Sequence, residues 1–144
     1  MGQKVNPTGL RVGISKTWNS KWYAGKDYPE QLKQDLSIQK FVKKRLKHAA
    51  ISHIEVERTA KKTKVNIFTA RPGIIIGRKG DEVERLKHEL NKLTRHEVIV
   101  NIKEIKRPEI DATLVAENIA NQLERRIAYR RAIRRAMTSA MRMN

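Results

Sequence analysis

Along residues 51–106 an apolar side chain occurs first at every second residue, then at every third or fourth, and then at every second again. This change limits the chain to a mixed fold of strands and helices. Residues 51–58 and 64–69 alternate apolar and polar side chains around a short polar connection, which predicts a β-hairpin. Residues 83–93 have helical spacing, and residues 97–106 alternate again. We therefore expect an α+β domain with a three-stranded sheet packed by helices.

One further helix is predicted before this segment and another after it. Residues 28–50 place apolar side chains at intervals of three to five, with lysines between them. Residues 111–141 are expected to form one long helix opened by Asp111, with an apolar stripe in its first half. A helix of that length spans about 45 Å. Its second half should therefore extend beyond the core of so small a domain.

The charge balance favours a polyanionic partner. The 144 residues include 32 lysines and arginines against 15 acids, a formal net charge of +17. Nucleic acid is the leading candidate, because such a surplus repels itself until phosphates neutralise it. An anionic membrane surface is less favoured, because the basic residues are spread from end to end. There is no cysteine, which excludes disulfides and thiolate metal sites and suits a reducing cytosol.

Residues 1–26 contain no acid and are rich in glycine, so we expect a basic extension that becomes ordered on its partner. The candidate RNA contacts in this extension are Lys4, Arg11 and Lys16. Its aromatic residues are Trp18, Trp22 and Tyr23. These rings suit either stacking on bases or packing against the domain, and packing is slightly favoured.

A Gly-x-x-Gly loop, Gly77-Arg78-Lys79-Gly80, separates the apolar run 74–76 from the helix 83–93. Such a pattern is common by chance, and its context gives it weight. The first glycine lets a nucleic-acid backbone approach closely, and the last permits a tight entry to the helix. The free N–H groups of that helix and the charges of Arg78 and Lys79 suit phosphate, with Ile75 and Ile76 as candidate apolar contacts for bases.

The second half of the predicted long helix is dense in arginine. The candidate RNA contacts there are Arg126, Arg130, Arg131, Arg134 and Arg135, with Arg125 beside them. The alternative is a solvated helix end, where cations interact favourably with the helix dipole. That effect is worth about 1 kcal/mol and fades within one turn. It does not account for three turns of arginine, so RNA contact is favoured.

No catalytic pattern is found. The segment 73–80 lacks the spacing of a Walker loop or a dinucleotide fingerprint. The four histidines are scattered without a metal-binding spacing, and no serine or carboxylate pair forms a recognisable catalytic arrangement. We therefore expect a binding protein that is not an enzyme and uses no metal or other cofactor.

Several motifs together resemble a known family. Ile76-Gly77-Arg78-Lys79-Gly80, in a helix-strand-strand-helix-helix-strand order, is similar to the type II KH domain. The segments Met1-Gly2-Gln3-Lys4-Val5-Asn6-Pro7, Thr69-Ala70-Arg71-Pro72-Gly73 and Gln122-Leu123-Glu124-Arg125-Arg126 look like the bacterial family of small ribosomal subunit protein three. The likeness covers essentially the whole chain, so it is more specific than the loop alone.

This resemblance implies a cytoplasmic structural component of the small-subunit head, bound to ribosomal RNA and to neighbouring ribosomal proteins. It also implies that Arg130, Arg131 and Arg134 match basic positions that line the channel by which messenger RNA enters. The chain then divides into a basic extension (1–27), a type II KH domain (28–110) and a long C-terminal helix (111–144). Members of the family continue into a second α/β domain, which we expect this chain to lack. A free-standing KH protein that regulates RNA and a nucleic-acid-processing enzyme are the alternatives.

Overall fold

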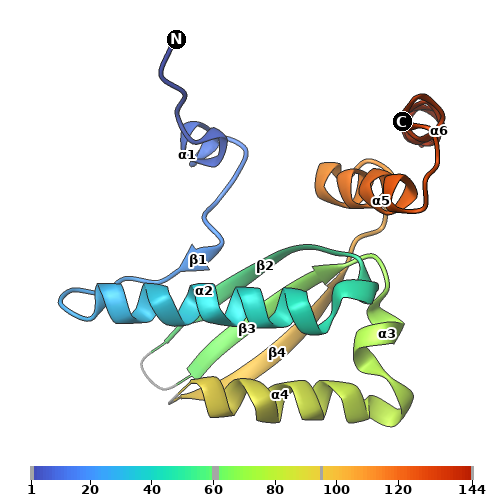
Figure 1. The fold of residues 1–144 in the computed structure, drawn as a ribbon. Coiled ribbons are helices and arrows are strands. Elements are labelled where there is room, and N and C mark those ends of the chain that lie inside the picture. Colours follow the sequence, from blue (N-terminus) through green and yellow to red (C-terminus); the bar gives the residue numbers. More distant parts are fainter. Residues whose placement is uncertain (1, 60–61, 95, 144) are drawn as a thin grey trace.

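The computed structural model describes residues 2–59, 62–94 and 96–143, apart from the side chain of Lys79. One four-stranded sheet lies behind two long helices (Figure 1). Its strands, in spatial order, are β1 (Ser20–Lys21), β2 (Ile51–Arg58), β3 (Lys62–Thr69) and β4 (Glu97–Glu104). β2 and β3 are antiparallel, as a hairpin requires, whereas β4 runs parallel to β3 through a helical crossover.

The helices are α1 (Pro7–Arg11), α2 (Tyr28–Arg45), α3 (Pro72–Ile76), α4 (Asp81–Leu93), α5 (Ala112–Glu124) and α6 (Tyr129–Arg142), with 3₁₀ turns η1 (Lys47–Ala49) and η2 (Arg78–Gly80). From α2 to β4 the elements follow the predicted order. The sequence from α2 through β2, β3, α3 and α4 to β4 is the arrangement expected of a type II KH domain. The predicted α+β class is confirmed.

The packing of the core accounts for the alternating apolar residues of the strands and for the helical spacing of α2 and α4. Alternate residues of the strands, among them Ile54, Val65 and Val98, face the helices and are at most 2% exposed. Residues of α2 and α4 close over them, including Val42 and Leu90, both fully buried. Each large aliphatic side chain in such a position contributes roughly 1.5–3 kcal/mol relative to an exposed one. The sheet is therefore held by its packing against these two helices.

The prediction of one long helix over residues 111–141 is wrong. α5 ends at Glu124, Arg126 adopts a left-handed conformation with φ of 59°, and α6 begins only at Tyr129. The turn sets α6 across α5 and in contact with it, since Figure 1 shows α5 lying across the view and α6 seen nearly end-on. Ala132 thereby becomes fully buried, and an extended helix would leave that face in water. The predicted opening at Asp111 is confirmed, since its side chain accepts from the N–H groups of Thr113 and Leu114.

The N-terminal extension is more regular than predicted. Asn6 caps α1 by accepting from the N–H groups of Thr8 and Gly9, and Pro7 occupies the first turn, where its missing donor does no harm. β1 adds a fourth strand, parallel to β2, to the three that were predicted. Two residues are too few to show alternation, so the sequence has no signal for this strand. The predicted helix over 28–50 ends early, at Arg45.

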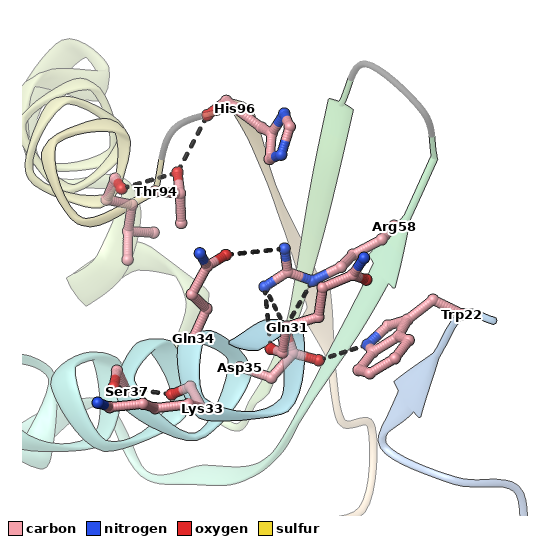
Figure 2. Close-up of polar contacts among 10 residues, drawn as sticks. Trp22, Gln31, Lys33, Gln34, Asp35, Ser37, Arg58, Thr94 and His96 are labelled. Carbon is pink, nitrogen blue, oxygen red and sulfur yellow. Dashed lines mark hydrogen bonds and ion pairs between the residues drawn. The ribbon is translucent and has the colours of Figure 1, made fainter. Parts of the chain in front are cut away.

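A buried polar cluster joins the N-terminal extension to the domain (Figure 2). Asp35 of α2 is fully buried and accepts from Arg58 Nε at 2.8 Å and from Trp22 Nε1 at 2.6 Å. Arg58 also donates to Gln34 Oε1 at 3.1 Å. The ring of Trp22 therefore packs against the domain, whereas Tyr23 is 96% exposed.

The histidine on β2 makes folding stability depend on pH. Burial lowers the pKa of His53 below its ordinary value of 6.5, with Lys21 and Lys16 acting in the same direction and Glu55 and Asp111 opposing them. The unfolded chain then binds this proton more readily than the folded one, so stability is full above pH 6.5 and falls as the pH drops through that value. Urea melts at pH 7.5 and 5.5 should show this loss, and His53→Phe should reduce it. An unchanged loss in the variant would contradict the assignment to His53.

Within the described residues, no helix is both long and apolar enough to cross a lipid bilayer. The same part of the chain contains no cluster of three or more histidine or acidic side chains placed to share a metal ion.

Candidate nucleic-acid interface

One face of α6 forms a groove of about 430 Å³ whose walls are cationic. We call this the arginine groove; it is lined by Arg131, Arg134, Arg135, Thr138, Ser139 and Arg142. The lining positions recur at three- and four-residue intervals, so they form a continuous strip along one side of the helix. All four arginines are exposed, and their guanidinium groups can therefore meet a ligand without a conformational change.

The charges of this groove have no acidic partner among the residues that the structure describes. No acid follows Glu124 in the sequence, and in the described ranges no salt bridge involves an arginine of α6. Arg130, beside the groove, interacts instead with its neighbour, at 5.7 Å from the ring centroid of Tyr129 and 3.1 Å from its hydroxyl. Like charges at this density destabilise a helix unless an anionic ligand offsets them.

The turn before α6 separates Arg126 from the arginines with which the sequence predicted it to align. Arg126 lies in the left-handed turn rather than on the helix, so it does not continue the row of Arg130 and Arg134. The prediction missed Arg142, which lines the groove together with Arg131. Its position eleven residues after Arg131 is three helical turns further along the same face, and that spacing was the available signal.

Both glycines of the Gly-x-x-Gly loop adopt conformations that favour glycine. Gly77 has φ of 69° and ψ of −170°, and Gly80 has φ of 87°. A Cβ at position 77 would lie 2.7 Å from Cγ of Glu82, so the chain passes too close to the next helix to carry a side chain there. Gly80 ends the single 3₁₀ turn η2, which begins at Arg78.

The surroundings of this loop are less cationic than the sequence suggested. α4 begins at Asp81 without a side-chain cap, the N–H of Asp81 donates to the carbonyl of Arg78, and the first turn holds Asp81, Glu82 and Glu84. These carboxylates oppose phosphate binding at the end of the helix. Ile76 is 43% exposed and suits contact with a base, whereas Ile75 is 1% exposed, so its expected contact with bases is wrong.

The basic residues of the N-terminal extension form a third group. Lys4, Arg11 and Lys16 are all exposed, and Arg11 Nη1 donates to the carbonyl of Pro7 at 2.8 Å. The extension, the Gly-x-x-Gly loop and α6 lie at separate corners of the molecule (Figure 1). The structure therefore places the predicted contacts in three separate regions rather than in one site.

Comparisons with known proteins identify a matching family model and similar proteins. Residues 37–110 match the family model of the KH domain. Proteins called small ribosomal subunit protein uS3 from Geobacter sp. (strain M21) and Geotalea uraniireducens (strain Rf4) are each 62% identical to the chain over 141 residues. These alignments cover 98% of the chain and 67% of each relative. The same-named protein of Desulfatibacillum aliphaticivorans is 57% identical over 143 residues, which are 99% of the chain and 65% of that protein.

The chain belongs to the uS3 family of small ribosomal subunit proteins. Proteins of this family are structural, non-enzymatic components of the cytoplasmic ribosome. The predicted family, the KH domain, the absence of enzymatic activity and the location are thereby confirmed. The chain spans about two thirds of the length of these uS3 relatives.

The conformation of Gly77 makes this loop sensitive to a single methyl group in the uS3 fold. We expect Gly77→Ala to destabilise the domain by about 1–3 kcal/mol, because it combines a positive φ with a close approach to Glu82. Thermal melts followed by circular dichroism would measure this. Gly73→Ala is the matched control: nothing lies within 4 Å of its added Cβ, and we expect it to be neutral or stabilising. Equal melting temperatures for the two variants would refute the strain at Gly77.

Proposed function

We propose that the chain acts as a structural component of the small-subunit head that binds ribosomal RNA and contributes basic residues to the channel through which messenger RNA enters. The observation that carries this proposal is the row of five arginines on α6 with no acidic partner among the described residues. Its partners are ribosomal RNA, messenger RNA and neighbouring ribosomal proteins.

The chemistry of the arginine groove suits a sugar-phosphate backbone. A guanidinium group presents paired N–H donors that match two phosphate oxygens, and it stays charged at all physiological pH values. Arg131 and Arg135 are one helical turn apart, about 6 Å along the axis. Successive phosphates of an extended single strand are separated by a comparable distance, so one strand can follow the helix without any base being read. Such contact suits a message whose sequence varies.

The separate basic groups suit a protein held by RNA on several sides. In this proposal the KH domain (28–110) is the body, the extension (1–27) inserts Lys4, Arg11 and Lys16 among ribosomal RNA phosphates, and the helical pair within 111–144 faces the message. The loop around Arg78 and Lys79 makes a weaker contact, because three carboxylates follow it at once. Arg126 adds a further exposed charge in the turn between α5 and α6.

Crosslinking in assembled particles tests this assignment. Small subunits containing the chain would be programmed with messages carrying one 4-thiouridine at a series of positions downstream of the decoding site. We expect crosslinks to α6 peptides over a narrow window of positions and none from upstream positions. Crosslinks independent of position, or their absence from α6 throughout, would contradict the proposal. Failure of the chain to remain with small subunits at high salt would favour a free-standing KH protein.

A further inference from the structure

A second apolar strip runs along α2, beside the face that packs on the sheet. Tyr28, Leu32 and Leu36 recur every four residues, and Tyr28 and Leu36 are 50% and 57% exposed. With their neighbours they line a groove of about 500 Å³ on the outside of the domain. Isolated exposed leucines are ordinary, but a row of apolar side chains in a groove on so charged a chain indicates a surface that a partner covers.

One end of this groove is held rigidly. The ring of Trp22 lies 5.4 Å from that of Tyr28, and its Nε1 donates to the buried Asp35 at 2.6 Å. Figure 2 shows the indole of Trp22 directed at Asp35 on α2. Tyr28 is thereby supported from the N-terminal extension. A partner that docks there would lose little binding energy to ordering the surface.

The rim of the groove is positively charged. Lys33 and Lys40 line it, and Lys43 and Lys44 continue along the same helix. No acid lines the groove, and within the described ranges no salt bridge engages Lys33 or Lys40. A protein surface that covers the apolar strip must therefore bring carboxylates to these lysines, or bury the charges unpaired at a large cost.

We propose that this groove docks an acidic amphipathic helix of a partner protein. Apolar side chains spaced by three and four residues on that helix fit along the strip from Tyr28 to Leu36, and glutamates or aspartates beside them meet Lys33 and Lys40. RNA is a poorer occupant. Tyr28 gives the groove a single ring at one end, and the rest of its apolar lining is leucine and proline, which cannot stack successive bases. Its cations are lysines, which lack the paired donors by which arginine holds a phosphate.

A photo-crosslinking residue at position 36, in small subunits assembled with the full chain, identifies the occupant. The expected result is crosslinking to one protein segment whose sequence is helical, amphipathic and acidic, and loss of that product with Lys33→Glu and Lys40→Glu together. The same photo-crosslinker at position 93 on α4, where leucine is 48% exposed, is the control for exposed apolar positions. Crosslinks to RNA, to a second copy of this chain, or to nothing would overturn the proposal.

Titration separates docking from mere proximity. The crosslinked segment, made as a synthetic peptide, would be titrated against the purified chain. We expect Leu36→Glu to weaken its binding at least tenfold, and the effect of the two lysine substitutions to shrink as salt is raised. Leu93→Glu should leave binding unchanged. Equal binding to the unaltered chain and to the Leu36→Glu variant would overturn the proposal, and this outcome is independent of what α6 binds.

Discussion

Replacement of Arg131, Arg134 and Arg135 together by alanine is expected to weaken binding to a single-stranded RNA about 100-fold at low salt. Each arginine that contacts a phosphate contributes roughly 1 kcal/mol at an exposed site, so three contribute about 3 kcal/mol, and each 1.4 kcal/mol is a factor of ten. All three side chains line the arginine groove without acidic partners among the described residues. Fluorescence anisotropy with a labelled oligouridine would measure the change.

Two controls separate a phosphate site from general charge. Alanine at Lys43, Lys44 and Lys47 removes the same charge from exposed positions on α2 and η1, and should reduce affinity far less. Lysine at the three arginine positions keeps the charge but not the paired donors, so we expect an intermediate loss. Alanine favours helix at least as well as arginine, and α6 should remain folded in the test variant. If both alanine triples weaken binding equally, the arginine groove is not a distinct site.

Asp35→Ala is expected to destabilise the fold by about 3–5 kcal/mol, the largest stability effect of the predicted substitutions. It leaves the guanidinium of Arg58 buried without its counter-ion and deprives Trp22 Nε1 of its acceptor. For a chain of this size the melting temperature should fall by roughly 10 °C or more. Thermal melts of the purified variant would measure the fall.

The partner substitutions decide whether the loss comes from the buried charge. Asp35→Leu combined with Arg58→Met removes both charges, so the double variant should be more stable than Asp35→Ala alone. Asp27→Ala is the surface control; this carboxylate makes no capping bond at the start of α2 and should matter by less than about 0.5 kcal/mol. A double variant no more stable than the single one would show that the pair itself contributes the stability.

The elements that the sequence predicted well are those whose apolar period is long and regular. α2, β2, β3, α4 and β4 each span eight residues or more, and the strands and α4 bury residues of their predicted faces. On α2 the prediction holds only in part, because Val42 of the predicted stripe is buried whereas Leu36 is 57% exposed. The two loop glycines were also predictable, because positive φ is a property of glycine itself. The candidate RNA contacts on α6 followed from composition, since arginines without acids nearby need no tertiary information to be recognised.

The features that the sequence did not predict depend on tertiary contacts. The turn at Arg126 contains neither glycine nor proline. Its left-handed residue closes α5 with hydrogen bonds from the N–H groups of Arg126 and Ile127 to the carbonyls of Leu123 and Gln122, and α6 then packs on α5. The ion pair of Asp35 and Arg58 joins positions 23 residues apart, and each residue alone looks like a solvated charge. β1 is ordered by pairing with β2, not by any pattern of its own. In each case a distant partner overrides the local signal.

The salt dependence of RNA binding tests the central claim most directly. The arginines of α6 are proposed to bind RNA by contacting phosphates. If all five contact a single strand, the logarithm of the binding constant should fall with the logarithm of salt concentration at a slope of about −3.5. The variant with alanine at Arg131, Arg134 and Arg135 should then have a slope shallower by about 2. A slope near zero for the unaltered chain, or equal slopes for the two proteins, would contradict the account.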